Sequence, residues 1–203
     1  MSPRAETVLV LLNGELRGAA SVRAAARRAD AVIAADGGAR HAKTLRIEPD
    51  YVVGDMDSVG PRPRSWTKAL WWPDLDPDRS DLDKAFDFAR GLKAKRVLFA
   101  GALGGGLDHE LVNLAALEEN AKGLDVSVVA DQNAHLLGKG RHRVALRKGA
   151  RFSLLAAPSA SLTLSGAKFA FSGVLRRGSR GLGNTAKGTV SLTVRSGRVW
   201  LIH

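Results

Sequence analysis

The chain has 203 residues, of which 45% are hydrophobic and 25% are charged, as is typical of a soluble globular protein with one or two domains. It contains no cysteine, which excludes disulfides, thiolate zinc sites and cysteine nucleophiles. The apolar run at residues 8–12 is too short for a signal peptide, and no stretch approaches the roughly 20 apolar residues of a membrane helix. We therefore expect a cytoplasmic protein without a membrane partner.

The formal net charge of +11 is compatible with a nucleic acid and equally with an anionic small molecule as a partner. Bases are scattered among acids through most of the chain, and the densest group of bases comprises Lys139, Arg141, His142, Arg143, Arg147, Lys148 and Arg151. Aromatic residues make up only 5% of the chain and do not interleave with this group, which argues against a surface for stacking bases. We expect no nucleic-acid partner.

Short apolar runs alternate with helical patterns in the first two thirds of the chain. Strands are predicted at residues 8–12, 31–35, 51–54, 69–72, 96–100 and 126–130, and helices at 19–29, 39–45, after Ser80 and at 107–121. Ser80 is a good N-cap with Asp83 three residues later, and Pro61 and Pro63 are expected to break the chain. The alternation predicts an α/β domain at residues 1–138, with a mostly parallel sheet covered by helices on both faces.

After about residue 138 the pattern changes to short alternating stretches separated by turns that contain Gly and Ser. These stretches lie at residues 143–146, 152–155, 161–164, 168–171, 189–194 and 198–202. The pattern predicts a small antiparallel β-sandwich domain at residues 139–203.

Polar residues are predicted at the ends of four strands. They are Asp36-Gly37-Gly38, Gly54-Asp55-Met56-Asp57, Ser80-Asp81 with Lys84, and the run from Gly101 to Asp108. Because the carboxyl ends of parallel strands meet at one edge of a sheet, we expect these residues to converge. Asp55 and Asp57 repel each other unless a cation such as Mg²⁺ lies between them. An Asp-rich turn that caps the next helix is the alternative interpretation.

The chemistry of these groups suits phosphoryl transfer. The glycine run offers backbone N–H groups beside a helix N-terminus, and Lys84 offers a positive charge for a phosphate oxygen. The acids offer metal ligands, and positioning and charge neutralisation account for most of the catalysis in such reactions. The run does not match the dinucleotide-binding fingerprint, because Leu103 stands where glycine is required, and the chain has no P-loop.

Six motifs span most of the chain. They are Ala35-Asp36-Gly37-Gly38-Ala39; Gly54-Asp55-Met56-Asp57-Ser58; Ser80-Asp81-Leu82-Asp83-Lys84-Ala85; Gly104-Gly105-Gly106-Leu107-Asp108-His109 with Asn113-Leu114; Leu164-Ser165-Gly166-Ala167-Lys168-Phe169; and Gly178-Ser179-Arg180-Gly181-Leu182-Gly183-Asn184-Thr185. In identity and order they resemble the motifs of the bacterial thiamine pyrophosphokinase (thiamine diphosphokinase) family. The resemblance implies an ATP-binding α/β domain, a thiamine-binding β-sandwich domain, and a homodimer with thiamine near the subunit interface. It also implies transfer of a diphosphoryl group from ATP, the co-substrate, to the thiamine hydroxyl, giving thiamine diphosphate and AMP.

The resemblance also implies roles for individual residues. Mg²⁺ and the ATP phosphates would be held by Asp55, Asp57 and Asp81, which with Asp108 form the expected catalytic set. The nucleotide site would be lined by Asp36, Gly37, Ser80, Lys84, Gly104, Gly105 and His109. Thiamine would be held by Asn113, Ser179, Asn184 and Thr185.

Two positions depart from the family's pattern, which usually has Arg where this chain has Gly106 and a second Ser where it has Gly183. An arginine beside a transferring phosphate supplies about 3 kcal/mol of charge stabilisation. Its absence predicts slower turnover, a substitute such as Arg79 or Arg177, or a changed reaction. The departures leave open another acceptor, such as a pterin alcohol, and a binding protein without catalytic activity.

Overall fold

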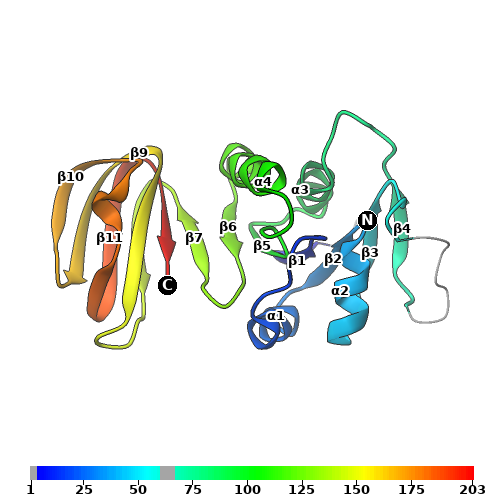
Figure 1. Cartoon of the computed structure of the whole chain (residues 1–203), viewed down its shortest axis with the longest axis horizontal. Coiled ribbons are helices and arrows are strands. Elements are labelled where there is room, and N and C mark those ends of the chain that lie inside the picture. The colour runs from blue at the N-terminus through cyan, green and yellow to red at the C-terminus, as the bar shows by residue number, and fades with distance from the viewer. Residues whose placement is uncertain (1–3, 60–66) are drawn as a thin grey trace. The chain divides into compact units, whose positions relative to one another are not determined.

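The computed structural model describes residues 4–59 and 67–203, which divide into two compact units (Figure 1). Unit 1 is Met1–Asp131 and unit 2 is Gln132–His203. The division lies before the domain boundary expected at residue 138, because strand β7 (Ala134–Leu137) pairs with the last strand of the chain. The break expected at Pro61 and Pro63 lies outside the described residues.

The sheet of unit 1 is parallel, as its sequence pattern predicts. Its strands are β1 (Thr7–Leu11), β2 (Ala31–Ala35), β3 (Tyr51–Gly54), β4 (Leu70–Pro73), β5 (Arg96–Ala100) and β6 (Asp125–Val128). They lie in the order β6-β5-β1-β2-β3-β4, and every neighbouring pair is parallel. Because β2 and β5 lie on opposite sides of β1, the chain order reverses at the centre of the sheet, where open α/β sheets bind ligands.

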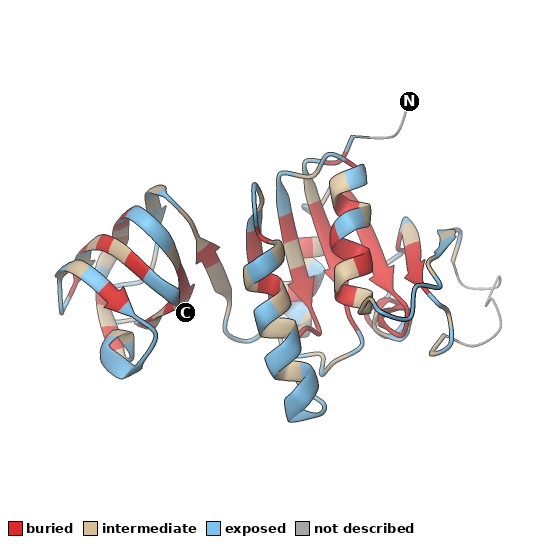
Figure 2. Ribbon diagram, turned by 90° about the horizontal axis from the view of Figure 1, so that it is seen from above, coloured by how far each residue is buried: buried red, intermediate tan, exposed pale blue. Residues whose placement is uncertain are grey.

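Helices cover both faces of this sheet, because alternate strand residues point to opposite sides. The helices are α1 (Ala19–Ala26), α2 (Gly38–Leu45), α3 (Asp81–Gly91) and α4 (Leu107–Asn120). On one face Leu9 packs in a buried cluster with Val22 of α1 and Ala42 of α2. On the other face Phe86 of α3 contacts Phe99 of β5, with their ring centroids 4.6 Å apart. In Figure 2 the central strands are largely buried, whereas much of α4 is exposed.

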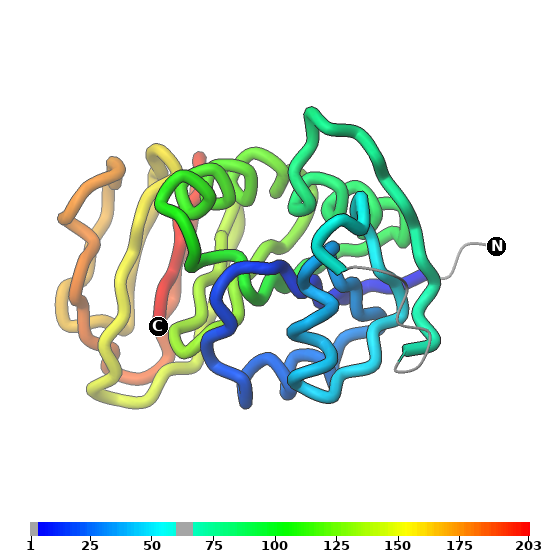
Figure 3. Tube along the Cα trace, turned by 45° about the vertical axis from the view of Figure 1, so that its right-hand side comes forward, coloured from blue at the N-terminus to red at the C-terminus, as the bar shows by residue number. Residues whose placement is uncertain are grey.

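The start of α3 confirms the predicted N-cap. Ser80 Oγ accepts a hydrogen bond from the backbone N–H of Asp83 at 3.2 Å and donates one to the Asp83 carboxylate at 2.7 Å. These bonds satisfy a helix N–H that would otherwise lack a partner. Figure 3 traces the connection from β4 to α3.

Unit 2 consists of fewer and longer strands than expected. After β7 come β8 (Gly140–Val144), β9 (Arg151–Ala167), β10 (Phe171–Arg176), the 3-10 helix η1 (Ser179–Gly181) and β11 (Asn184–Ile202). The prediction of separate short strands was wrong in detail, because residues 152–155 and 161–164 both belong to β9, and 189–194 and 198–202 both belong to β11. The stretch at 168–171 enters a strand only at Phe171, and β7 was not expected.

The long strands of unit 2 form a β-sandwich-like fold around an apolar core. Strand β11 pairs antiparallel with β7 and β8, and β10 pairs antiparallel with β9. Where β9 pairs with β11, residue numbers decrease along β9 as they increase along β11. Ser191 lies opposite Ser165, and Val194 lies opposite Leu162. Alternate side chains of both strands, such as Leu162 and Leu192, are buried in one cluster.

The described residues contain no helix that combines the length and the hydropathy needed to cross a membrane.

Gly38 sets how closely α2 approaches β1, and its replacement by alanine tests this packing. A Cβ at Gly38 would lie 1.9 Å from the carbonyl oxygen of Leu11, whereas a Cβ at Gly91 of α3 would meet nothing within 4 Å. We expect Gly38→Ala to lower the free energy of unfolding by about 2 kcal/mol or more, because the clash is with backbone. The matched control, Gly91→Ala, should be neutral or stabilising by up to about 1 kcal/mol. Urea unfolding measures both, and equal effects would contradict the assigned role of Gly38.

Candidate active site

Three carboxylates converge at the carboxyl ends of two neighbouring parallel strands. Asp36 follows β2, and Asp55 and Asp57 follow β3. One carboxylate oxygen from each lies within 4.8 Å of the other two. Asp36 is 2% exposed, whereas Asp55 and Asp57 are exposed to solvent. The arrangement has a buried floor and an open rim, as a ligand-binding site requires.

Gly54 makes this convergence possible. Its φ is +143°, and a Cβ there would lie 2.9 Å from the Asp36 Cβ and 3.3 Å from Asp81 Oδ1. Asp81, the first residue of α3, therefore reaches the same place from a third element. Any larger residue at position 54 would push the two carboxylates apart. Gly54 thus fixes the spacing of Asp36 and Asp81 as well as the course of the chain.

The carboxylates repel one another, and a single buried lysine lies against them. Lys84 Nζ is 3.7 Å from Asp55 Oδ2, and the lysine side chain is 2% exposed. Burial, followed by the charge of Asp36, raises the pKa of Asp81 to about 6, although Lys84 opposes the shift. Among the described residues, buried Asp36 Oδ1 has no hydrogen-bond partner. The site therefore holds more negative charge than its own cation neutralises.

An arginine of α2 joins two of the loops at this edge of the sheet. Arg40 donates from Nη1 to the carbonyl oxygen of Ser58 at 2.9 Å and from Nη2 to Asn13 Oδ1 at 3.1 Å. Ser58 Oγ in turn donates to Asp57 Oδ1 at 2.9 Å. The Asn13 side chain also lies against Gly37, where a Cβ would come within 2.4 Å of it. The partners of the Arg40 guanidinium are uncharged, and one of them, Ser58, is the residue that follows Asp57 of the acidic cluster.

Sequence reasoning missed both Asn13 and Arg40. Asn13 carries a usable signal, because it follows the central strand β1 and the end of that strand lies at the point where the chain order reverses. Arg40 lies in the first turn of α2 and gives no pattern of its own.

The glycine run after β5 is held by the loop after β1 and by α4. Gly14 N–H donates to the carbonyl oxygen of Gly101 at 2.9 Å, and Asn113 Nδ2 donates to that of Ala102 at 2.8 Å. Gly104 N–H donates to Glu110 Oε1 at 2.7 Å, so this amide is already paired. Asn113, expected to hold thiamine, and Glu110, which was not expected, both position the loop in this structure.

The start of α4 carries three of the remaining expected positions. Asp108 and His109 are exposed, and Asp108 Oδ1 accepts the backbone N–H of His109 at 2.9 Å. A Cβ at Gly106 would lie 2.3 Å from Asp108 Oδ1, so a larger residue there would displace a flexible side chain rather than backbone. A Cβ at Gly105 would meet nothing within 4 Å, and the loop is open at that point.

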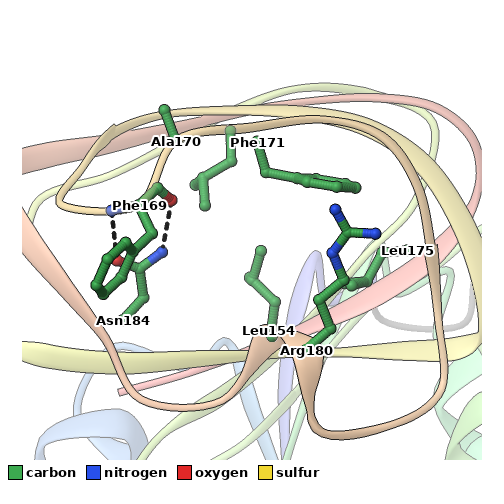
Figure 4. Close-up of a pocket in the computed structure, with 9 residues that line it drawn as sticks. Leu154, Phe169, Ala170, Phe171, Leu175, Arg180 and Asn184 are labelled. Atoms are coloured by element: carbon green, nitrogen blue, oxygen red, sulfur yellow. Dashed lines mark hydrogen bonds between the residues drawn. The ribbon is translucent and has the colours of Figure 1, made fainter.

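The remaining expected residues lie in unit 2, beside a small pocket of about 180 Å³ (Figure 4). The pocket is lined by Leu154, Leu164, Phe169, Ala170, Phe171, Leu175, Arg180, Gly181 and Asn184. Asn184 donates to the carbonyl oxygen of Phe169 at 2.8 Å and accepts backbone N–H groups from Phe169 at 3.1 Å and Thr185 at 2.8 Å. Its amide therefore fastens the turn before β10 to β11. Arg180 lies 4.7 Å from the Phe171 ring centroid, and exposed Ser179 begins η1.

The structure thus brings together five of the expected residues, and around them it groups the acids differently from the expectation. Those five are Asp36, Asp55, Asp57, Asp81 and Lys84. The three acids whose oxygens lie within 4.8 Å of one another are Asp36, Asp55 and Asp57. Asp36, which was expected in the nucleotide site, thus takes the place that was expected for Asp81. Ser80 caps α3 next to this group, and Gly37 contacts Asn13.

The chain is similar in sequence to known proteins. The family model described as thiamin pyrophosphokinase, catalytic domain, matches residues 22–130. Thiamine pyrophosphokinase 1 of Oryza sativa subsp. japonica is 30% identical over 141 residues, and thiamine pyrophosphokinase 2 of Arabidopsis thaliana is 32% identical over 142 residues. These matches cover 62% and 61% of this chain and 53% and 52% of the relatives, so the chain spans about half the length of the curated relatives it matches.

Solved structures share the fold over nearly the whole chain. The thiamine pyrophosphokinase of Bacillus subtilis has a TM-score of 0.79 at 19% identity and is covered to 97%, as is this chain. The thiamin pyrophosphokinase of Candida albicans has a TM-score of 0.73 at 16% identity, with 98% of this chain and 88% of that chain covered. The structural match establishes the fold, and the family model covers more than half of the sequence, including every acid of the converging group. The chain therefore belongs to the thiamin pyrophosphokinase family.

Proposed function

We propose that the protein transfers a diphosphoryl group from ATP to the hydroxyl of thiamine, with Mg²⁺, and releases AMP. The observation that carries the proposal is the convergence of Asp36, Asp55 and Asp57, with one buried carboxylate oxygen that lacks a partner among the described residues. In the reaction, the thiamine oxygen forms a bond to the β-phosphorus, and the bond between that phosphorus and the bridging oxygen to the α-phosphate breaks. AMP leaves with that oxygen, and the thiamine hydroxyl loses its proton to water.

The donor set fits Mg²⁺. Hard divalent cations take carboxylate oxygens, and a cation bound by Asp36, Asp55 and Asp57 would satisfy the unpaired oxygen of Asp36. Asp81 lies beside them and would complete the acidic wall. When bound, Mg²⁺ would neutralise phosphate charge and orient the transferring group. This assignment adds Asp36 to the metal ligands that the sequence led us to expect, which were Asp55, Asp57 and Asp81.

The chain's own residues position the acids and the phosphates. Lys84 holds Asp55 from the buried side, and Gly54 keeps Asp36 and Asp81 close. The open backbone at Gly105 and the exposed Asp108 and His109 at the start of α4 line the rim where the phosphates are proposed to lie. The backbone N–H of Gly104 is already bonded to Glu110. Gly104 therefore contributes to the site by fastening its loop to α4.

Arg40 is a better substitute for the arginine missing at Gly106 than the two candidates named from the sequence. Arg79 is bound to Asp74, Asp87 and the carbonyl oxygen of Asp83. Arg177 lies in unit 2 and donates to the carbonyl oxygen of Ala156. The partners of Arg40 are uncharged, so its positive charge is retained beside the acidic cluster.

In the proposal, unit 2 contributes the thiamine site, with Ser179 and Thr185 near the bound molecule and Asn184 fixing the surrounding backbone. A homodimer and a cytoplasmic location are part of the proposal and rest on the family resemblance and the sequence.

The deciding experiment measures AMP release from ATP and Mg²⁺ with and without thiamine. Thiamine-dependent AMP with an equal amount of thiamine diphosphate supports the proposal. Thermal stabilisation by thiamine and ATP without AMP would indicate a binding protein, and AMP release with another alcohol would indicate a different acceptor.

Replacing Asp57 tests the acidic cluster. We expect Asp57→Asn to lower kcat by at least about 100-fold, because it removes a metal ligand, while the urea midpoint stays within error of the wild type. Asp76→Asn, which removes the same charge from the exposed connection between β4 and α3, should leave kcat unchanged. A near-normal rate for Asp57→Asn would remove this residue from the site.

Replacing Asp81 tests the electrostatic strain of the acidic site. Its pKa is raised from 3.8 to about 6, so the folded protein holds this proton more tightly than the unfolded chain. The contribution of Asp81 to stability is therefore greatest below pH 4 and is lost as the pH rises through 6. In EDTA at pH 8, Asp81→Asn should be more stable than the wild type by about 1–3 kcal/mol, and the difference should vanish at pH 4. Urea unfolding at the two pH values provides the measurement, and an equal difference at both would refute the argument.

Replacing Arg40 tests the proposed substitute for the missing arginine. We expect Arg40→Ala to lower kcat by about 100-fold, the scale of other preorganised donors, with a smaller change in the KM for ATP. Arg40→Lys should recover part of kcat, because it keeps the charge but not the forked geometry. Arg28→Ala on the exposed surface after α1 is the control. An unchanged kcat for Arg40→Ala would leave Gly106 without compensation.

A further inference from the structure

The charges of the chain are divided sharply between its two units. All 20 acidic residues precede residue 132, and 13 of the 31 lysines and arginines follow it. Unit 1 therefore carries a formal charge of −2 and unit 2 a formal charge of +13. The expectation of no nucleic-acid partner assumed that bases are scattered among acids. That premise holds for unit 1 and fails for unit 2, which contains no acidic residue.

Strand register gathers part of this charge on one sheet face. Arg141 and Arg143 are the exposed alternate residues of β8, and they lie opposite Thr193 and Ser191 of β11. Residues directly opposite each other in paired strands share a face. Thr193 in turn lies opposite Thr163 of β9. The neighbouring alternate residues Leu162, Leu164 and Leu192 point the other way, into the core.

The face continues across the next strand and gains a third arginine. Thr163 lies opposite Ser172 of β10, and their hydroxyl oxygens are 3.0 Å apart. Arg195 donates from Nη1 to Thr163 Oγ1 at 2.7 Å and from Nη2 to Ser172 Oγ at 3.3 Å. Both partners are uncharged, so the guanidinium is held in place without being neutralised. We call the surface formed by Arg141, Arg143, Ser191, Thr193, Thr163 and Arg195 the basic face.

We propose that the basic face binds the phosphate backbone of a nucleic acid. Guanidinium and hydroxyl groups are the side chains that contact phosphate oxygens in protein–nucleic acid complexes, and those contacts carry no sequence information. The strand arrangement repeats such donors in rows across neighbouring strands, which suits a polymer with regularly spaced charges. The face has no aromatic side chain for stacking bases, so binding is independent of sequence and depends on salt.

The composition of the face favours a nucleic acid over a lipid surface. Peripheral membrane binding combines basic residues with apolar side chains that insert below the headgroups. Of the large apolar side chains exposed in unit 2, Phe169 and Leu182 lie in turns, and only Val174 lies on these strands. Val174 alternates with Ser172 and shares its side of β10, so it is a single apolar side chain beside the basic face, on a strand that does not pair with β8. The basic face itself presents charged and hydroxyl groups.

Fluorescence anisotropy tests this with the full chain and two labelled probes of one length and mixed sequence, a duplex DNA and a single-stranded RNA. Neither ATP nor thiamine is present, so the result does not depend on the proposed catalysis. We expect both probes to bind at 50 mM salt and to weaken steeply by 200 mM. In the triple variant Arg141→Gln/Arg143→Gln/Arg195→Gln, the slope of log K against log salt for duplex DNA should fall by about 0.9 for each phosphate that is no longer neutralised. Affinity at 50 mM salt should fall at least about tenfold.

A matched control separates the basic face from net charge alone. Arg27→Gln/Arg28→Gln/Lys122→Gln removes the same three charges from exposed positions of unit 1 and should keep the wild-type affinity within about twofold. Equal reductions in affinity in the two triple variants, or no binding of either probe at 50 mM salt, would overturn the proposal. So would binding to vesicles that contain phosphatidylglycerol without binding to either probe. The basic-face variant should retain wild-type AMP release in the thiamine assay if that activity is present, because none of its residues belongs to the acidic site.

Discussion

Mutual repulsion among carboxylates at one edge of a parallel sheet is the interaction on which the site depends. The buried strands β2 and β3 fix where Asp36 and Asp55 emerge, and Gly54 removes the side chain that would separate Asp36 from Asp81. One buried lysine offsets part of the repulsion. The hydrophobic burial of the sheet therefore holds a group of like charges that would disperse in an unfolded chain.

The rim of the site is held mainly by polar groups that already have partners. Glu110 and Asn113 fasten the glycine run, Ser80 caps α3, and Arg40 ties together the loops after β1 and β3. These hydrogen bonds hold the loops in fixed positions relative to the sheet. Residues that resemble ligands in a motif can therefore act by shaping the backbone, and Asn184 does the same in unit 2.

The sequence predicts most of unit 1, because each of its signals is local. The apolar runs end where the strands end, the Ser80 cap forms as expected, and parallel pairing brings the acids to one edge. The role of Gly54 could not be predicted, because it depends on how closely β2, β3 and α3 approach one another. The same holds for Arg40, whose contacts join residues far apart in the sequence.

Unit 2 was predicted less well because its turn-forming residues lie inside strands. Pro158 and Ser159 lie between the stretches 152–155 and 161–164, which were expected to be separate strands, yet β9 continues through them. Ser159 pairs with Arg176 of β10, and the Pro158 carbonyl accepts the Arg177 N–H at 2.8 Å. Long bent strands with interrupted apolar patterns resemble pairs of short strands when only alternation is considered.

The segregation of acidic residues also decides how the chain responds to acid. Acid unfolding proceeds by protonation of carboxylates that are ionised in the folded state. Unit 2 has no acidic side chain, so its titratable side chains below neutral pH are histidines. Burial lowers the pKa of His203, so the folded protein takes up that proton less readily than the unfolded chain. One polypeptide thus joins a part with 20 acidic side chains, which acid protonates, to a part with none, where His203 is the group through which acid lowers stability.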